Sequence, residues 1–278
     1  NYEHEPVEMT FEKAPEKVFA YANSNVEELL ALGLGDKIVA AYGLDGDVRE
    51  DLKDEFDKIQ YMDTKPSKEE VVAMEPDFIA AWYSSFSDDW LSDVSFWQER
   101  DVNTYMSLNS SAKGPASEFP RTIEDEYEDI LNLGKIFDCE DKAEEIVDQM
   151  KGEIDKVKEH VEGTDPLSVA VLEDEGDSFR VYGTETLGGN IPETLGAELK
   201  LGAENSENVG AEDLIAADPD VLFMINYDGF MTADEAIADI TDNPAYASLS
   251  AVKNNKVFSV NLNEVYCSGV RTYDGIMT

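Results

Sequence analysis

Cysteine and histidine are scarce in this sequence, which excludes several kinds of site. Among 278 residues there are two cysteines, Cys139 and Cys267, and two histidines, His4 and His160. Two cysteines are too few for a disulfide scaffold or a cysteine-ligated zinc site, so we expect free, half-buried thiols, with one bridge as the alternative. Two distant histidines exclude an imidazole-rich zinc or manganese site and leave a serine or cysteine nucleophile without its base.

Basic residues are also few. Lysine and arginine number 21 against 62 aspartates and glutamates, a formal net charge of −41. A chain this negative repels nucleic acid and anionic lipid, which excludes both as non-specific partners. The acids are scattered rather than gathered in one tail, so most of them are expected to form a solvated surface. Such a surface suits a secreted or salt-exposed protein, but it does not identify a ligand.

Long apolar runs are missing as well. No stretch reaches about 18 apolar residues, so no membrane-spanning helix is predicted. Residues 1–6 lack the basic and apolar regions of a signal peptide, and we expect any signal or lipid-anchor cysteine upstream of Asn1. Hydrophobic residues make up 42% of the chain, enough for a buried core, and the length favours two domains.

The first part of the chain alternates between strand and helix patterns. Apolar runs predict strands at 17–21, 37–41, 76–82 and 103–108. Helices are expected over 26–32 with Asn25 as N-cap, from 66 onward, and over 90–100. Strands separated by helices at this spacing indicate parallel pairing with helical crossovers.

Two long helices are expected next, over 122–137 and 140–162, because nearly every residue there is a helix former. In the second helix, apolar residues recur mostly three or four positions apart, which places them in one stripe. They are Ala143, Ile146, Val147, Met150, Ile154, Val157 and Val161.

The strand and helix pattern then returns. Strands are expected at 167–172, 179–182, 221–225 and 257–260, and helices over 191–195, 212–217 and 234–240. The predicted fold class is therefore α/β, with two Rossmann-like lobes joined by one long connecting helix. The expected domains are an N-terminal lobe at 1–138, the connecting helix at 139–163 and a C-terminal lobe at 164–278.

Four segments of the sequence, taken in their order along the chain, resemble those of a known family. They are Pro15-Glu16-Lys17-Val18 with 29–39, Met74-Glu75-Pro76-Asp77-Phe78, Asp218-Pro219-Asp220-Val221, and Asn243-Pro244-Ala245-Tyr246 with 249–258. Together they resemble the cobalamin and iron-siderophore class of ABC transporter substrate-binding proteins, from about Pro15 to Met277. The chain departs from the family at Thr278, which cuts off a final helix begun near Asp274. The resemblance implies a ligand cleft between the lobes, little hinge closure and docking onto a permease dimer through one acidic group on each lobe.

Candidate ligand-binding residues follow from the rule that open α/β sheets bind ligands beyond the carboxyl ends of their strands. In the first lobe they are Asn23, Ser24, Trp82, Tyr83 and Asn109; in the second, Arg180, Tyr182, Tyr227, Tyr266 and Arg271. Aromatic faces suit a large flat ligand, and arginines suit carboxylate or catecholate oxygens. The alternatives are packing roles for the aromatics, a surface ion pair for Arg180 and helix capping by Arg271. Three further basic residues are expected to be solvated charges: Arg100, Lys113 and Arg121.

Two acids, Asp88 and Glu212, match the positions of the family's permease-docking carboxylates. The family usually has Glu where this chain has Asp88, and the adjacent Asp89 is an alternative. Acids at helix starts are also favoured by the helix dipole, which is a purely structural explanation for both.

The expected function is that of an extracytoplasmic solute-binding protein of an ABC importer. It would capture an iron-siderophore, haem or cobalamin as a monomer, and be lipid-anchored to the outer face of the cell membrane or periplasmic. No resident cofactor or metal is expected, although the ligand itself carries iron or cobalt. Two arginines favour a chelate of low net charge, such as a ferric hydroxamate, over a tris-catecholate. The alternatives are a surface adhesion or sensor domain and an enzyme, for which Gly183-Thr184 and Gly188-Gly189-Asn190 offer phosphate-cradling turns without a full glycine-rich motif.

Overall fold

The computed structural model describes residues 1–3, 5, 7–110, 120–202, 208–227 and 229–278. His4 and Lys113 lie outside the described residues. The chain divides into two compact units. Unit 1 comprises Asn1–Lys113, Glu124–Asp148 and Cys267–Val270, and unit 2 comprises Gly114–Ile123, Gln149–Tyr266 and Arg271–Thr278. No described helix is both long and apolar enough to cross a membrane.

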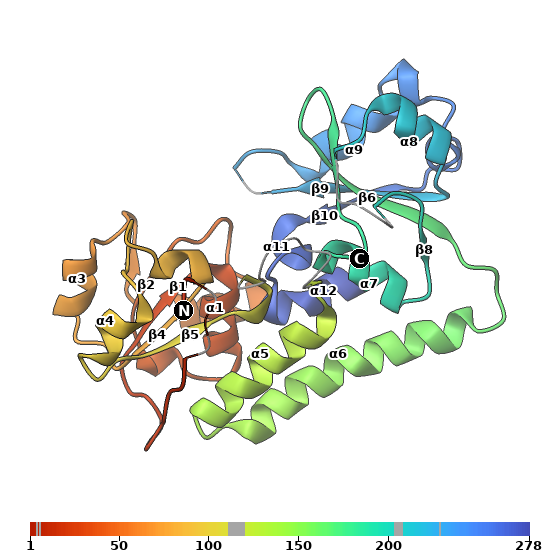
Figure 1. Cartoon of the computed structure of the whole chain (residues 1–278). Coiled ribbons are helices and arrows are strands. Elements are labelled where there is room, and N and C mark those ends of the chain that lie inside the picture. Colours follow the sequence, from red (N-terminus) through yellow and green to blue (C-terminus); the bar gives the residue numbers. More distant parts are fainter. Residues whose placement is uncertain (4, 6, 111–119, 203–207, 228) are drawn as a thin grey trace. The chain divides into compact units, whose positions relative to one another are not determined.

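Unit 1 is built on a parallel sheet in the order β3-β2-β1-β4-β5, which confirms the predicted crossovers (Figure 1). Its strands are β1 (Val18–Tyr21), β2 (Ile38–Tyr42), β3 (Tyr61–Met62), β4 (Phe78–Ala81) and β5 (Asn103–Met106). Its short helices are α1 (Asn23–Ala31), α2 (Lys53–Phe56), α3 (Lys68–Ala73) and α4 (Val94–Gln98). Phe19, Ile79 and Trp97 are buried within one hydrophobic cluster of this unit.

Two helices of unit 1 begin at other places than the sequence pattern indicates. Helix α1 starts at Asn23 directly after Ala22, whose φ of 71° turns the chain from strand into helix. Asn25 is therefore not the N-cap, and its amide instead donates to the Tyr21 carbonyl at 2.9 Å. Helix α4 covers only Val94–Gln98, because Ser92 has a φ of 63° and ends the preceding turn.

The two long helices, α5 (Ile123–Ile136) and α6 (Glu140–Val161), are close to their predicted ranges. A Cβ at Gly134 of α5 would lie 2.5 Å from the Ala143 Cβ of α6, so this glycine permits their close approach. The α6 stripe is buried at Ala143, Val147, Met150 and Ile154, whereas Val161 is exposed.

Unit 2 has a sheet in the order β10-β9-β6-β7, with β8 also pairing with β6. Strand β7 is antiparallel to β6, and the other pairs are parallel. The strands are β6 (Ser168–Asp174), β7 (Phe179–Val181), β8 (Glu198–Leu199), β9 (Val221–Asn226) and β10 (Val257–Asn261). The helices are α7 (Leu187–Thr194), α8 (Ala211–Ala217), α9 (Ala233–Thr241), α10 (Ser250–Lys253), α11 (Leu262–Val265) and α12 (Thr272–Met277).

The sheet of unit 2 is covered on both faces. Ala170, Leu172 and Met224 pack in one cluster with apolar residues of α8 and α9, and α7, α11 and α12 lie on the opposite side (Figure 1). Successive side chains of a strand point to opposite faces of the sheet, so they pack against different helices.

The region around the glycines of unit 2 differs from its expected form. Helix α7 begins at Leu187, with Thr186 as its N-cap, and includes Gly188-Gly189-Asn190. A Cβ at Gly189 would lie 2.0 Å from the Gly183 carbonyl oxygen. Gly189 therefore permits close packing of helix α7 against the backbone at Gly183.

The two cysteines are not bridged. Cys139 is a half-buried free thiol, as expected, whereas Cys267 is a free thiol that is fully buried. The single-bridge alternative is therefore not realised.

Candidate functional site

The carboxyl ends of β1 and β4 in unit 1 carry three of the predicted residues. The Trp82 indole Nε1 donates to the Ser24 hydroxyl at 3.2 Å, and its ring meets that of Tyr21 edge-on at 6.0 Å. The next residue, Tyr83, donates its backbone N–H to the Ser110 hydroxyl at 3.1 Å. Trp82 and Tyr83 are both half-buried. Unit 1 therefore presents partly exposed aromatic faces at this edge.

The two predicted asparagines are buried and bind nearby loops. Asn23 accepts from the Asp45 N–H at 2.6 Å and donates to the Gly46 carbonyl at 3.4 Å. Asn109 donates to a Glu126 carboxylate oxygen at 2.5 Å. Both amides thus support the loops around the strand ends, and contact with a ligand stays a prediction for them.

A group of buried carboxyls in unit 1 is absent from the sequence prediction. Glu28 of α1 and Glu126 and Asp129 of α5 are all almost fully buried. Asp129 accepts from the Tyr105 hydroxyl at 2.6 Å and from the Leu108 N–H at 2.8 Å. Within the described part of the chain, no group of acidic, histidine or cysteine side chains could hold a metal ion.

Burial raises the pKa of all three carboxyls. It raises the pKa of Glu126 to about 7, against the lowering effect of its hydrogen bonds from Asn109, Gly269 and Ser268. The pKa values of Glu28 and Asp129 are raised well above the ordinary range by burial and then by neighbouring carboxylates. A sequence signal existed, because Glu126 and Asp129 fall on the same helical face as the buried Ile130 and Leu133.

In unit 2, a cluster of arginine and tyrosine lies at the carboxyl end of β6. Arg180 of β7 forms an ion pair with Glu173 at 3.6 Å, and its guanidinium lies 5.3 Å from the Tyr182 ring centroid. The Tyr182 hydroxyl donates to the same Glu173 carboxylate at 2.9 Å. Burial raises the pKa of Tyr182, so its hydroxyl remains a donor. The ion pair expected for Arg180 is confirmed.

Arg121 also belongs to this cluster, and the sequence did not predict its contacts. It is half-buried, its guanidinium lies 5.8 Å from the Tyr266 ring centroid, and its backbone N–H donates to the Glu185 carbonyl at 3.1 Å. The expectation of a freely solvated charge is therefore wrong for Arg121. Tyr266 also contributes to the raised pKa of Tyr182, which indicates that the two phenols are neighbours. We call Arg121, Glu173, Arg180, Tyr182 and Tyr266 the arginine–tyrosine cluster.

The two remaining predicted residues of unit 2 differ in exposure. Arg271 directly precedes α12 and is only 9% exposed. It lowers the pKa of Glu264, which burial raises. Tyr227, directly after β9, stacks at 5.2 Å on Phe230, which is 81% exposed. Phe230 is thus an accessible aromatic face that the sequence analysis did not single out.

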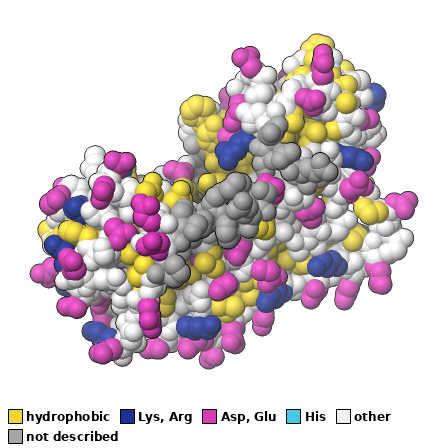
Figure 2. Space-filling model, in the orientation of Figure 1, with side chains coloured by type: hydrophobic (Ala, Val, Ile, Leu, Met, Phe, Trp, Pro, Cys, Tyr) yellow, Lys and Arg dark blue, Asp and Glu magenta, His cyan; other side chains and the backbone are white. Residues whose placement is uncertain are grey.

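The two predicted docking acids are exposed, one in each unit. Glu212 lies in the first turn of α8, whereas Asp88 lies in a turn and not at a helix start. The helix-dipole explanation therefore applies to Glu212 alone. Acidic side chains are spread over the visible surface rather than confined to one patch (Figure 2).

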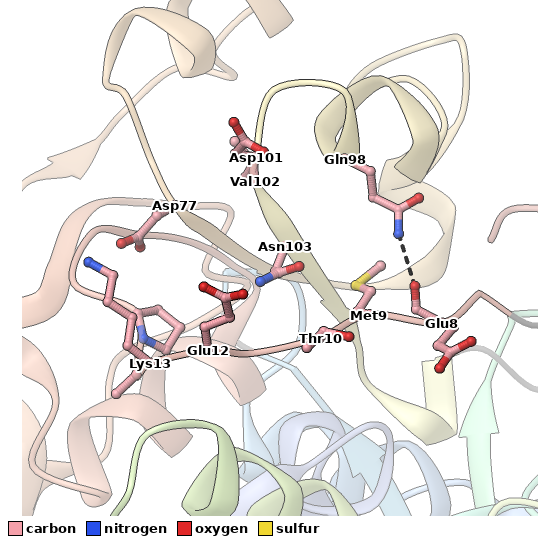
Figure 3. Close-up of a pocket in the computed structure, with 12 residues that line it drawn as sticks. Glu8, Met9, Thr10, Glu12, Lys13, Asp77, Gln98, Asp101, Val102 and Asn103 are labelled. Carbon is pink, nitrogen blue, oxygen red and sulfur yellow. Dashed lines mark hydrogen bonds between the residues drawn. The ribbon is translucent and has the colours of Figure 1, made fainter.

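An open cavity of about 560 Å³ lies at the opposite, amino-terminal edge of the unit 1 sheet (Figure 3). Residues of the 8–15 segment, Asp77 and Asn103 line it, and Gln98 donates to the Glu8 carbonyl at 3.2 Å. The Asp77 carboxylate accepts the backbone N–H groups of Glu16 and Lys17, at 3.0 and 2.8 Å. Asp77 therefore has a structural role at the start of β4, away from the aromatic edge.

Comparisons with known proteins agree with this architecture. The sequence model of the family described as periplasmic binding protein matches residues 18–261. The crystal structure of a periplasmic binding protein from Veillonella parvula has a TM-score of 0.88 and 31% identity, covering 95% of this chain and 83% of that chain. The uncharacterized ABC transporter substrate-binding lipoprotein YvrC of Bacillus subtilis is 24% identical over 97% of this chain and 80% of its own length. The Fe(3+)-citrate-binding protein YfmC of the same organism is 25% identical over 71% of this chain and 58% of its own.

Proposed function

Because the chain belongs to the periplasmic binding protein family, we propose that it is the extracytoplasmic substrate-binding component of an ABC importer. Its ligand on this proposal is an iron-siderophore, haem or cobalamin, which it delivers to a membrane permease. The relatives described as an ABC transporter substrate-binding lipoprotein and an Fe(3+)-citrate-binding protein support both parts of the proposal. The family is one of solute-binding proteins, so no catalytic step is assigned to the chain.

The main support for a metal chelate as the ligand is the arginine–tyrosine cluster of unit 2. A guanidinium over a phenol ring offers donors to chelate oxygens, while the ring offers a face to the organic part of the chelate. The partly exposed Trp82 and Tyr83 of unit 1 provide further aromatic surface. These groups suit a metal chelate with an organic shell better than a small inorganic ion.

Charge favours a chelate of low net charge. The positive charge of Arg180 is shared with Glu173, and Arg271 is buried beside Glu264. Distant acids matter little, since at physiological salt the Debye length is about 8 Å. The cationic groups of the arginine–tyrosine cluster are therefore Arg121 and the Glu173-paired Arg180, each placed against a tyrosine. We therefore rank a ferric hydroxamate, haem or cobalamin ahead of a ferric tris-catecholate.

Calorimetric titration of one protein preparation with a ferric trihydroxamate, a ferric tris-catecholate, haem and cobalamin tests this ranking. We expect at least one of the ferric trihydroxamate, haem and cobalamin to bind saturably, with micromolar or tighter affinity. Tighter binding of the tris-catecholate would contradict the ranking, and no binding of any of the four would contradict the receptor assignment.

By analogy with the family, we also assign a membrane partner to the chain and roles to its remaining candidate residues. Asp88 and Glu212 would contact the permease dimer, and the receptor would act as a monomer on the outer side of the membrane. Asn23, Ser24 and Asn109 would orient the ligand-facing loops of unit 1, and Tyr227 would add an aromatic face in unit 2.

A further inference from the structure

The segment before β1 is anchored on the body of unit 1 beside the edge strand β5. Val7 and Met9 pack against the hydrophobic cluster of this unit. The Thr104 backbone N–H of β5 donates to the Met9 Sδ at 3.4 Å, and Gln98 of α4 donates to the Glu8 carbonyl at 3.2 Å (Figure 3). Residues 7–9 are therefore held in place by both apolar and polar contacts.

From this anchor the segment extends to the carboxyl edge of the sheet. There the Tyr2 ring stacks on the Tyr83 ring, with the ring centroids 5.7 Å apart and the ring planes 15° from parallel. Tyr83 follows Trp82 at the end of β4. The Glu5 backbone N–H donates to the Asn1 Oδ1 at 2.8 Å, which closes the turn that carries Tyr2. Tyr2 therefore joins the edge that carries the two candidate aromatic residues of unit 1.

The stack has the geometry of a surface that is prepared before a ligand arrives. The Tyr83 backbone N–H is bound by Ser110, and its ring is covered on one side by Tyr2. A ring that is fixed in advance loses less conformational freedom on binding. Tyr2 itself is 40% exposed, so part of its ring is open to solvent and adds little to the core. Tyr2 also precedes residues 18–261, which the family model matches.

We propose that Tyr2 is a ligand-binding residue, which holds the Tyr83 ring in place and adds its own exposed face to the aromatic edge of unit 1. This role rests on the proposed function, in which the chelate contacts Trp82 and Tyr83. The part of the chelate that meets Tyr2 is an apolar or conjugated portion of its organic shell, because phenol rings offer a face to such groups.

Nitration of tyrosines by tetranitromethane, followed by peptide mass spectrometry, tests the stack without any ligand. Tyr2→Ala should increase the nitration rate of Tyr83 severalfold, because one face of the Tyr83 ring is uncovered. The matched control is Phe258→Ala, which removes another exposed ring, 43% exposed and 5.8 Å from the Phe223 ring, on the edge strand of unit 2. An equal Tyr83 rate in Tyr2→Ala and the unmodified protein would overturn the inference, whether or not the protein is a receptor.

Calorimetric titration with a ferric trihydroxamate, haem and cobalamin tests the contact with ligand. For the chelate that the unmodified protein binds most tightly, Tyr2→Ala should reduce the affinity about two- to tenfold, as loss of an aromatic contact does. Tyr2→Phe and Phe258→Ala should keep the affinity, and the melting temperature of Tyr2→Ala should be nearly unchanged because the ring is exposed.

A double-mutant cycle with Tyr83→Ala separates the two parts of the role. Because Tyr2 acts partly through the Tyr83 ring, the two losses of binding free energy should be less than additive. Fully additive losses would contradict the positioning of Tyr83 by Tyr2. Normal affinity of Tyr2→Ala for a chelate that the unmodified protein binds would overturn the inference and leave the proposed function standing. Binding of none of the chelates would overturn both.

Discussion

At the scale of single residues, Arg180 and Arg271 of unit 2 have different surroundings, although the sequence predicted a ligand-binding role for both. Arg180 has a side chain 46% exposed and an ion pair with Glu173. Arg271 is buried and lies near Glu264. An exposed ion pair contributes little to stability, whereas a buried arginine is costly to remove.

Substitution of the two arginines should therefore give two different results. Arg180→Ala should weaken chelate binding by about 1 to 3 kcal/mol with an almost unchanged melting temperature, because a charged hydrogen bond to the ligand is lost. Arg271→Ala should weaken binding by a similar amount and also lower the melting temperature. Calorimetric titration and thermal unfolding measure the two effects, with Arg100→Ala as the control. Unchanged affinity in both variants for every chelate would show that neither arginine contacts the ligand.

At the scale of elements, the strands were predictable and several helix starts were not. Most strands, including β1, β4 and β9, lie within two residues of their predicted ends, because continuous apolar runs identify buried parallel strands. The starts of α1 and α4 depend on positive φ angles at Ala22 and Ser92, residues that rarely adopt them. Helix α7 depends on the approach of Gly189 to Gly183, which only the folded chain creates.

The candidate site was predictable to a similar extent. Chain order placed Trp82 directly after β4, where the rule for parallel strands expects a ligand edge, whereas Arg180 lies within β7, which is antiparallel to β6. Arg121 and the buried Glu126 were missed, since their environments depend on contacts with distant residues, Tyr266 and Ser268. A glutamate is rarely buried, so the sequence alone favoured a solvated position.

Two glycines in the long helices should respond oppositely to alanine. Gly134→Ala places a Cβ 2.5 Å from the Ala143 Cβ, so we expect a destabilisation of about 1 to 3 kcal/mol from overpacking. Gly152→Ala meets no atom within 4 Å and should stabilise the protein by about 0.5 to 1 kcal/mol through helix propensity. Chemical denaturation compares the two. Stabilisation by both substitutions would show that α5 and α6 do not approach closely at Gly134.

At the scale of the whole molecule, the dominant property is the net charge of −41. Mutual repulsion of acids disfavours the compact state, and the buried carboxyls of unit 1 add to this effect. Protonation reduces both contributions, whereas salt mainly reduces the repulsion between exposed acids.

Stability should accordingly rise as the pH is lowered from 8 to 6. The folded pKa of Glu126, about 7, is above its unfolded value, so its contribution is present in full below the unfolded pKa and is lost as the pH rises through 7. The contribution of Glu126 to the free energy of unfolding should be about 1.4 kcal/mol larger at pH 6 than at pH 8. The depressed pKa values of Asp218 and Asp220 act oppositely, but only under more acidic conditions. Melting temperatures of the unmodified protein and Glu126→Gln across this range measure the effect, which the variant should reduce.

Docking to the permease should be separable from ligand binding. Replacement of Asp88 and Glu212 by alanine should leave chelate affinity unchanged and abolish uptake by the reconstituted importer, because both side chains are exposed. The control, with the same change of charge, replaces the exposed Glu128 and Asp242. Lost ligand affinity in the Asp88 and Glu212 variant, or normal uptake, would show that these residues have another role.

The receptor assignment itself is tested most directly by tryptophan fluorescence during titration with ferric siderophores, haem and cobalamin. Trp90 and Trp97 are buried, whereas Trp82 is half-buried at the aromatic edge of unit 1. We expect saturable quenching by at least one of these chelates at micromolar or lower concentration, with most of the quenching lost in Trp82→Phe. Fluorescence that never saturates with any of the three groups of ligand would contradict it.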